Sequence, residues 1–464
     1  MPRYANHRTG LHKGGPMHAS RYGAVAAPAV ILFTFLATPV IAAHDPGVRA
    51  GASGAGASFG SLSADQQAFF AVAQKEFTQS EALGDGLGPR FNLDSCAGCH
   101  VQPAIGGSAP AINPQVALAT AFGARNTPPS FISTNGPVRE ARFRLAPGGG
   151  RDGGVHALFV ISGRVDSSGD ATGCTISQDD FVGNLERNNI SFRIPTPVFG
   201  TGLMEMIPAS TLAANLAAQG QVKARLGISG HLNRNGNDGT VSRFGWKAQN
   251  ATLLLFAGEA YNVEMGISNE LFSTERDETA GCQYKSVPND STSATTQSGV
   301  AMLSDIEQFA LFMRLLAPPT PSTTTPGGAE SIAHGRQVFV STGCALCHTP
   351  SLTTGTATVA SLSNQQANLF SDMALHRMGP RLADYVQQGS AAGDEFRTAP
   401  LWGVGQRIFF LHDGRTGDLG QAIRAHASEG NGTFGPSEAN LVVLLYERLA
   451  DADQQDLLNF LRSL

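Results

Sequence analysis

Two pentapeptides carry the residue types best suited to chemistry, Cys96-Ala-Gly-Cys-His100 and Cys344-Ala-Leu-Cys-His348. In a Cys-x-x-Cys-His word, both thiols can form thioether bonds to haem vinyl groups, and the histidine can ligate the iron. A zinc site would need both cysteine pairs to converge on one metal, and a thioredoxin-like pair needs no histidine. The sequence therefore predicts two covalently bound c-type haems, held by Cys96, Cys99 and His100 (haem 1) and by Cys344, Cys347 and His348 (haem 2).

The composition favours a loop-rich protein of more than one domain. At 464 residues the chain is longer than one ordinary domain. Charged residues make up only 15%, the net charge is -5, and 54 glycines and 25 prolines favour short helices joined by loops. We expect no nucleic-acid partner, because the sequence has no basic patch or arginine run.

Residues 1–43 are typical of a secretion signal. Positive charges precede an apolar run over residues 24–42, and no acidic residue occurs before Asp45. Small residues permit cleavage after Ala42 or Ala43, which predicts export to the periplasm with no membrane span left after cleavage. The alternative is an uncleaved membrane anchor, since the apolar run is nearly long enough to cross a bilayer.

Cys174 and Cys282 lie outside the two haem words. In an oxidising compartment such a pair can form a disulfide. This bond would close a loop of about a hundred residues and contribute about 4 kcal/mol in the chain-entropy model. The alternative is two unrelated thiols.

Apolar periodicity predicts helices over residues 63–79, 208–226, 248–261, 303–316, 329–340, 437–449 and 451–464. In the first of these, Ser63 can cap the helix. The residues predicted to share one face of it are Phe69, Phe70, Val72, Ala73 and Phe77.

Three other segments break the helical pattern. Residues 44–60 are rich in Gly, Ala and Ser and predict a flexible leader, whereas residues 317–328 are rich in Pro, Thr and Gly and predict a domain linker. Punctuated apolar runs over about 101–200 predict strands or irregular loops. The predicted fold is mainly α, with two cytochrome c-like haem domains at 44–316 and 329–464, the first enlarged by the loop- and β-rich insertion.

A weak internal repeat supports two related haem domains. Residues 197–202 (PVFGTG) resemble residues 400–405 (PLWGVG), and each segment follows a Phe-Arg pair, at 192–193 and at 396–397. Each lies downstream of its own haem word. The predicted helix at 329–340 leads directly into the second word, as a cytochrome c domain begins.

Several longer stretches resemble the bacterial dihaem oxidoreductase family, often labelled thiol oxidoreductases. They are residues 87–103, 243–248, 264–267, 378–380 and 396–427. This family is a branch of the superfamily of dihaem cytochrome c peroxidases and the methylamine-dehydrogenase maturation enzyme. The resemblance implies two mainly helical cytochrome c folds facing each other, one haem storing electrons and the other reacting with peroxide or another oxidant.

The resemblance also implies a sixth ligand for the iron of haem 2. In the peroxidases a methionine lies a fixed distance after a His-Asp-Gly motif, and here the position fourteen residues after His412 is His426. Imidazole favours ferric iron more than a thioether does, which predicts a lower potential. A surface histidine at a helix end is the structural alternative, and Met373 and Met378 are rival ligands.

The resemblance implies an open iron at haem 1, because the peroxidases that close this iron use a histidine soon after the haem word, and here no histidine occurs between His100 and His156. A distant group is the alternative ligand; Met204 and Met206 are candidates, although core packing suits them better. Glu264 occupies the position of the superfamily's distal glutamate, which can move a proton between peroxide oxygens. An ordinary exposed glutamate is the simpler interpretation.

Trp246 falls near the superfamily's interhaem tryptophan and is predicted to relay electrons, with a core aromatic as the equal alternative. Two departures matter. Leu254 stands where the superfamily has a glutamine, which leaves peroxidase competence open. Residues 407–409 replace the Thr-x-Pro of the calcium site, so bridging calcium is not expected.

The sequence thus predicts a periplasmic dihaem c-type oxidoreductase. Electrons would enter at haem 2 from a small cytochrome c or a cupredoxin and pass to haem 1, where hydrogen peroxide or a similar small oxidant is reduced. The alternatives are a non-enzymatic electron carrier with two six-coordinate irons and an oxygenase like the dihaem rubber-cleaving enzymes. The thiol oxidoreductase label has no residue support, since Cys174 and Cys282 form no Cys-x-x-Cys pair.

Overall fold

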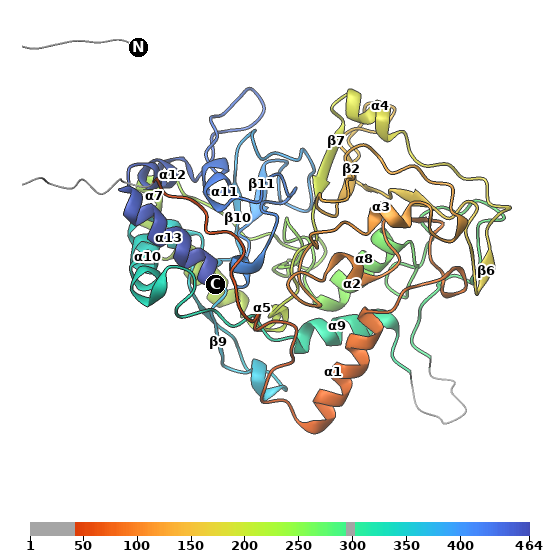
Figure 1. Cartoon of the computed structure of the whole chain (residues 1–464), viewed down its shortest axis with the longest axis horizontal. Coiled ribbons are helices and arrows are strands. Elements are labelled where there is room, and N and C mark those ends of the chain that lie inside the picture. Colours follow the sequence, from red (N-terminus) through yellow and green to blue (C-terminus); the bar gives the residue numbers. More distant parts are fainter. Residues whose placement is uncertain (1–41, 294–301) are drawn as a thin grey trace, which may run out of the picture. The chain divides into compact units, whose positions relative to one another are not determined.

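This computed structural model describes residues 42–293 and 302–464 (Figure 1). The chain contains two pairs of helices that pack closely against each other. In sequence, each pair brackets one haem word. The pairs are α1 (Ala64–Phe77) on α9 (Asp305–Leu315), and α10 (Gly328–Thr342) on α13 (Asp451–Ser463).

The start of α1 follows from its first residues. The Ser63 side chain accepts a hydrogen bond from the Gln66 backbone N–H, and the Gln66 side chain accepts from the Ser63 backbone N–H, which completes a capping box. Of the five apolar residues predicted to share a face, three are buried (Phe70, Ala73 and Phe77). Phe69 and Val72 are instead 56% and 59% exposed, because they lie one position away from the 3.6-residue repeat of the buried stripe.

The internal repeat is present in three dimensions. The Gly200 backbone N–H donates to the Leu316 carbonyl oxygen at 3.1 Å, just past the end of α9. Likewise, the Gly403 N–H donates to the Leu464 carbonyl oxygen at 3.0 Å, just past the end of α13. Each Gly-x-Gly turn is therefore fixed to the end of the second helix of its pair.

The second glycine of each turn lies directly against that helix. A Cβ at Gly202 would come within 2.1 Å of the Arg314 carbonyl oxygen, and one at Gly405 within 2.0 Å of the Arg462 carbonyl oxygen. Only glycine permits these approaches. The repeat thus encodes the same close contact twice.

The remaining helices are short. They are α2 (Cys96–Cys99), α3 (Gln115–Leu118), α4 (Phe181–Glu186), α5 (Thr201–Met206), α6 (Ala209–Ala217), α7 (Gly220–Leu226), α8 (Leu253–Met265), α11 (Leu419–Ala425) and α12 (Asn440–Glu447). Single 3-10 turns occur at η1 (Leu83–Asp85), η2 (Ala121–Gly123), η3 (Cys344–Leu346), η4 (Ala360–Leu362) and η5 (Val404–Gln406).

Two predicted helices have different bounds in the structure. The helix predicted at 208–226 is divided into α6 and α7, because Gln219 adopts a left-handed backbone with φ 56°. The helix predicted at 248–261 begins later, at α8, where the Thr252 side chain caps it by accepting from the Leu255 N–H. It runs on to Met265 and ends at Gly266 (φ 76°). Glu264 therefore lies on its last turn.

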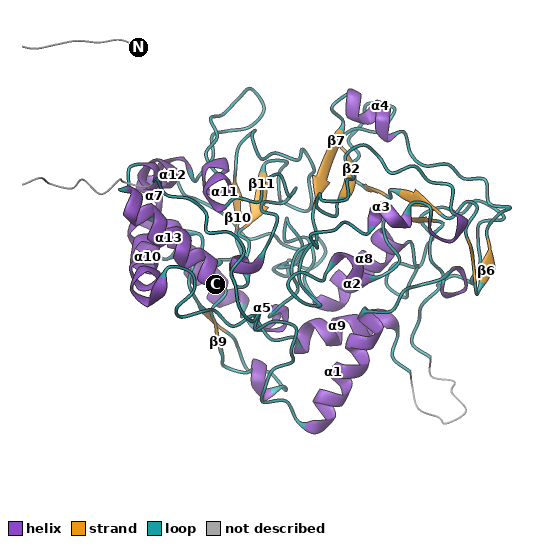
Figure 2. Cartoon of the chain, viewed as in Figure 1, coloured by secondary structure: helices purple, strands orange, loops and turns teal. Residues whose placement is uncertain are grey.

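Residues 101–200 contain short strands and loops, as predicted, together with the short helices α3 and α4 (Figure 2). A three-stranded antiparallel sheet has the order β3 (Val155–His156), β2 (Glu140–Phe143), β7 (Ile190–Arg193). The other sheets are antiparallel pairs: β1 (Arg90–Phe91) with β4 (Phe159–Val160), β5 (Val165–Asp166) with β6 (Gly169–Asp170), β8 (Leu352–Thr353) with β9 (Gln366–Ala367), and β10 (Leu375–Arg377) with β11 (Glu395–Arg397).

The predicted flexible leader is wrong. The carboxylate of Asp45 accepts two hydrogen bonds of 2.6 Å from Arg462 on α13 and one of 2.7 Å from the Leu419 N–H. The Arg49 N–H donates to the Gly405 carbonyl oxygen at 2.8 Å. Composition suggested mobility, but one buried ion pair fixes the segment along the C-terminal helix.

Residues 317–328, predicted as a linker, lie against the leader. The Ala317 N–H donates to the Ala57 carbonyl oxygen and the Thr320 N–H to the Gly54 carbonyl oxygen, both at 3.0 Å. Residues 42–464 form one compact unit, so the domain boundaries stay a prediction.

The predicted signal peptide lies outside the described residues except for Ala42 and Ala43. None of the helices in residues 42–293 and 302–464 combines the length and hydropathy that a membrane span requires.

The predicted disulfide between Cys174 and Cys282 is confirmed, with a Cα–Cα distance of 4.9 Å. Both cysteines are buried. The bond joins the insertion to the loop that follows α8.

The crossing of α10 and α13 generates a stability prediction. A Cβ at Gly335 would lie 1.9 Å from the Asp456 carbonyl oxygen, so Gly335→Ala must push the helices apart. We expect it to lower the free energy of unfolding by about 1–3 kcal/mol, seen as a lower thermal midpoint in circular dichroism. Gly220→Ala in α7, where a Cβ meets nothing within 4 Å, is the control and leaves the midpoint unchanged or higher. Equal midpoints for the two variants would contradict the packing argument.

Candidate functional site

The second haem word lines a cavity with a volume of about 230 Å³. We call it the His348 cavity. Cys344, Cys347 and His348 contribute to the lining, and most of the remaining lining is apolar, part of it from α10, α11, α12 and α13. His426, at the end of α11, lines the same cavity.

Three histidines share one hydrogen-bonding pattern. In each, Nδ1 lies against a backbone carbonyl, which can only accept a hydrogen bond, so Nδ1 carries the ring proton. The carbonyl partners are Gly107 for His100 (3.0 Å), Phe370 for His348 (3.0 Å) and Ala422 for His426 (2.8 Å). Such second contacts fix the ring orientation of metal-bound histidines.

Burial keeps these rings neutral. It lowers the pKa of His100 and His348 to about 4 and also lowers the pKa of His426. His426 contributes to the lowered pKa of His348, because the two rings are near each other. Neutral imidazoles are suited to ligate iron.

The rival ligands of the His348 cavity are placed differently. Met378 lines the cavity, whereas Met373 does not. His376 also lines it, but hydrogen bonds to carboxylates occupy both of its ring nitrogens. His426 differs from His376 because its Nδ1 partner is a backbone carbonyl, and its role as a ligand stays a prediction.

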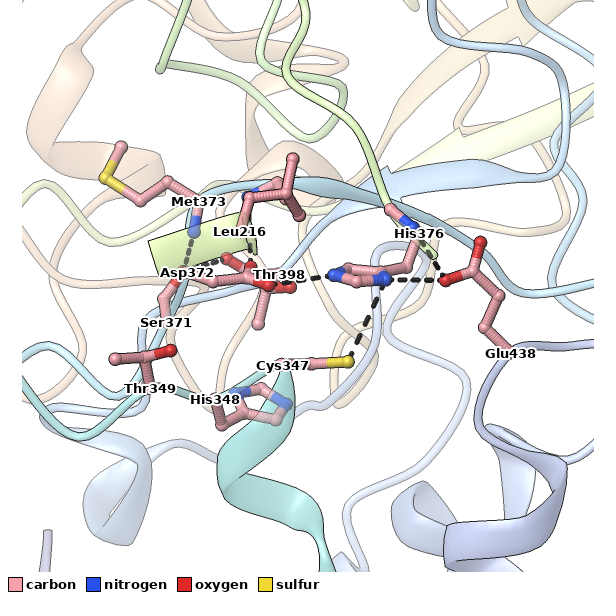
Figure 3. Close-up of polar contacts among 12 residues, drawn as sticks. Leu216, Cys347, His348, Thr349, Ser371, Asp372, Met373, His376, Thr398 and Glu438 are labelled. Carbon is pink, nitrogen blue, oxygen red and sulfur yellow. Dashed lines mark hydrogen bonds and ion pairs between the residues drawn. The ribbon is translucent and has the colours of Figure 1, made fainter. Parts of the chain in front are cut away.

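His376 belongs to a buried charge cluster that the sequence did not reveal (Figure 3). Its Nδ1 donates to Glu438 at 2.8 Å and its Nε2 to Asp372 at 2.9 Å, beside the Cys347 sulfur at 3.8 Å. Burial opposes charge here, but these three neighbours raise the pKa of His376 well above its usual value. Burial likewise works to raise the pKa of Glu438, yet His376 and Ser229 lower it to about 2. The cluster therefore holds an imidazolium between two carboxylates.

The first haem word lines a second cavity of about 160 Å³, which we call the His100 cavity. Cys96, Cys99 and His100 lie in its wall together with Glu264 and Trp246, the two residues predicted to be catalytic. Sequence reasoning thus selected two side chains that share one cavity with the haem word. Their roles stay predictions.

Trp246 lines both haem cavities. It is buried, and its Nε1 donates to the Ile194 carbonyl oxygen at 2.9 Å. The edge of its ring meets His412, with centroids 6.3 Å apart, and His412 stacks on Phe396 at 4.2 Å. An indole between the two cavities can serve either as a core aromatic or as an electron relay.

Glu264 is paired with a carboxyl group that sequence reasoning missed, Glu140. Glu264 and Glu140 share a side-chain hydrogen bond, and Asn92 Nδ2 donates to Glu264 Oε2 at 2.7 Å. Arg142 Nε donates to Glu140 Oε1 at 2.5 Å. Both Glu140 and Arg142 lie on β2, where residues two apart share a face, but only the fold brings that strand to α8.

The two carboxyls have opposite pKa shifts. Burial, and then the charge of Glu140, raise the pKa of Glu264 well above its usual value. Burial also acts to raise the pKa of Glu140, but Arg142, the hydrogen bond shared with Glu264 and the charge of Arg193 together lower it below the usual value. The opposite shifts favour the proton of the pair on Glu264 and the negative charge on Glu140.

The lining of the His100 cavity shows which of the other predicted residues lie near the first haem word. His100 is the only histidine among the described residues that line it, and Met204 and Met206 are absent from the lining. Leu254 does not line the cavity either, but Gln249 does, and its buried Oε1 has no hydrogen-bond partner. An open iron stays a prediction.

The sequence of this chain matches a known protein family. A family model described as "Di-haem oxidoreductase, putative peroxidase" matches residues 150–464. The chain belongs to the di-haem oxidoreductase family. The match includes Trp246, Glu264, the second haem word and His426, whereas the first haem word precedes it. Family membership implies two haems and an oxidoreductase activity.

Two solved structures are similar to this chain at low identity. A variant of the diheme peroxidase BthA from Burkholderia thailandensis is 15% identical, with 50% of this chain and 68% of that chain covered and a TM-score of 0.29. A MauG-like protein associated with microbial copper homeostasis is 14% identical, with 56% and 89% covered and a TM-score of 0.28. No curated protein matches significantly.

The His426 geometry predicts a spectroscopic change. In the haem-loaded ferric protein, a bis-histidine haem 2 should give a low-spin electron paramagnetic resonance signal, because two imidazoles impose a strong ligand field. We expect this signal to disappear in His426→Ala. His334→Ala, on the half-exposed face of α10, is the control and retains it. Persistence of the low-spin signal in His426→Ala would exclude this ligand.

The low pKa of Glu438 predicts an acid-dependent stability. The folded value, about 2, lies below the ordinary 4.5, so folding favours the ionised carboxyl. Its contribution is complete above pH 4.5 and is lost as the pH falls through about 2. We expect Glu438→Gln to lower the thermal midpoint near pH 7, with the gap to wild type closing toward pH 2.

The exposed Glu429 provides the matched control for this prediction, since Glu429→Gln should follow the wild-type midpoint at both pH values. A gap between Glu438→Gln and wild type that is equally large at pH 7 and pH 2 contradicts the ionised cluster.

Proposed function

We propose that this oxidoreductase is an exported, periplasmic dihaem c-type enzyme that reduces hydrogen peroxide or a similar small oxidant at the His100 cavity. Electrons enter at the His348 cavity from a small cytochrome c or a cupredoxin. The observation that carries the proposal is the buried Glu140–Glu264 pair, because reduction of an oxidant requires a group that holds and releases a proton beside it.

The donor sets suit covalent haem. Each cavity offers two free cysteines and one neutral histidine whose Nδ1 donates to a backbone carbonyl, with His426 as a further neutral imidazole in one of them. Haem iron supplies one-electron transfer and, where a coordination position is open, a place for the oxidant. The residues that would hold the haems are Cys96, Cys99, His100, Cys344, Cys347, His348 and His426.

Glu264 acts as the proton carrier. Its carboxyl is protonated at neutral pH because of burial and the adjacent charge of Glu140. Asn92 donates to Oε2 and so fixes the orientation of the group. Glu264 can then give its proton to the departing oxygen of the oxidant, so that water leaves, and regain one from the other oxygen. After Glu264 has given up its proton, both Glu264 and Glu140 are negatively charged. The positive charge of Arg142 beside Glu140 stabilises this state.

Electron supply matches this proton chemistry. Conversion of hydrogen peroxide to two waters consumes two electrons and two protons, and a chain that holds two haems can store both electrons. Trp246 lies in the wall of both cavities and is the aromatic group available between them. Its Nε1 donates to a neutral carbonyl, so its ring keeps its proton when it relays an electron.

Two observations support the location. The disulfide between Cys174 and Cys282 is typical of an oxidising compartment. The N-terminal 43 residues have the charge and hydropathy of a secretion signal.

Stopped-flow reduction of hydrogen peroxide by the dithionite-reduced, haem-loaded protein tests the proposal. We expect wild type to reoxidise with two electrons consumed per peroxide. Glu264→Gln, which cannot release a proton, should slow this step by about 10²–10⁴-fold. Because the acid form of Glu264 is required and its pKa is raised, the wild-type rate should be flat at neutral pH and fall in alkaline solution.

The exposed Glu278→Gln is the control and should react like wild type. Binding of carbon monoxide to the reduced protein tests the alternative of an electron carrier. If the reduced wild type binds no carbon monoxide and is reoxidised by peroxide no faster than Glu264→Gln, both irons are six-coordinate and the proposed reaction is contradicted.

A further inference from the structure

Arg407 is a buried cation without a counterion. It is only 6% exposed, and neither Nε nor Nη2 of its guanidinium has a hydrogen-bond partner. Burial alone lowers its pKa to about 10, so the group stays charged at neutral pH. Burying an unpaired charge costs several kcal/mol, which makes such a site unstable unless an anion completes it.

The position of Arg407 restricts what that anion can be. Its side chain lines the His348 cavity and also a smaller cavity of about 30 Å³. Trp246 lines both of these cavities and the His100 cavity, so the small cavity lies next to both haem positions. Arg397, likewise buried, lines the same two cavities as Arg407.

The other arginines of these cavities are already satisfied. Arg193 donates to Asp384 at 2.8 Å, and Arg142 donates to Glu140 at 2.5 Å. Arg397 donates from Nε to the Gly245 carbonyl oxygen at 3.1 Å and from Nη1 to the Thr398 carbonyl oxygen at 3.0 Å. Arg407 differs because two adjacent donors of its planar fork remain free, which is the geometry that binds a carboxylate through both oxygens.

We propose that Arg407 binds a propionate carboxylate of the haem held at Cys344 and Cys347, with Nε and Nη2 as the two donors. The inference rests on the proposed haem at the second word. A propionate is the anionic part of a haem, and the small cavity offers it an entrance beside Arg407 and Arg397. No carboxylate of the described chain pairs with Arg407 in its place.

The backbone around Arg407 is fixed from both halves of the chain. The Arg407 carbonyl oxygen accepts from Arg462 Nη1 at 3.0 Å, and the preceding carbonyl, of Gln406, accepts from Gln102 Nε2 at 3.2 Å. Gln102 lies two residues after His100. The backbone next to Arg407 is therefore hydrogen-bonded to the loop that follows the first haem word.

Spectroelectrochemical titration of the haem-loaded protein tests this assignment without reference to turnover. Loss of a buried positive charge favours ferric iron, so Arg407→Gln should shift the ferric/ferrous equilibrium of haem 2 at least tenfold, which is 59 mV for one electron, toward lower potential. The released propionate should also titrate, making that potential newly pH-dependent between pH 5 and 8.

Arg407→Lys keeps the charge but loses the two-donor fork, so it should shift the potential less than Arg407→Gln. It also keeps the test decisive if the glutamine variant fails to fold. Arg336→Gln, on the exposed face of α10, is the control and leaves the potential unchanged.

Two results overturn the assignment: an unchanged haem 2 potential with no new pH dependence in both Arg407 variants, or a shift confined to the haem of His100. Failure of peroxide turnover alone, with the potential shift present, would contradict the proposed reaction but leave the propionate site standing.

Discussion

The structure depends on where each cavity histidine places its one ring proton. Nδ1 of each of His100, His348 and His426 donates a hydrogen bond to a backbone carbonyl, and this contact fixes the ring orientation and keeps the proton on Nδ1. His376 shows the opposite case, since two carboxylates engage both nitrogens and fix the ring as a cation. The acceptors around each ring thus separate the neutral His100, His348 and His426 from the charged His376.

Charge burial gives the two cavities different properties. The His100 cavity has a carboxyl pair that holds one removable proton, because Arg142 stabilises the charge of Glu140 and burial keeps Glu264 neutral. The His348 cavity has a charged cluster around His376 and an uncompensated guanidinium at Arg407. One cavity is equipped to move protons, and the other to set a potential, which matches the division between oxidant site and electron entry in the proposed function.

Features that depend on short sequence patterns could be predicted from the sequence. Both haem words, the cap at Ser63, the disulfide and the Gly-x-Gly repeat depend on spacing or on one residue type, and the structure shows the last three directly. Glu264 and Trp246 came from a resemblance, and they share one cavity. Glu140 and Asp372 were not found, since each acts through a partner that only tertiary folding brings close.

The wrong prediction of a flexible leader has the same physical origin. Gly, Ala and Ser favour disorder in isolation, but Asp45 meets a partner on the last helix, and no local pattern reports a contact of that range.

That ion pair has a kinetic consequence. Asp45 and Arg462 are 417 positions apart, so the contact closes a loop that contains nearly all of the described chain, including both haem words. Contacts between residues so far apart in the sequence form late in folding, because closing a long loop costs conformational entropy before the contact can stabilise the folded state. We therefore expect the segment around Asp45 to dock on α13 late in folding, after the shorter-range contacts around the two haem words have formed.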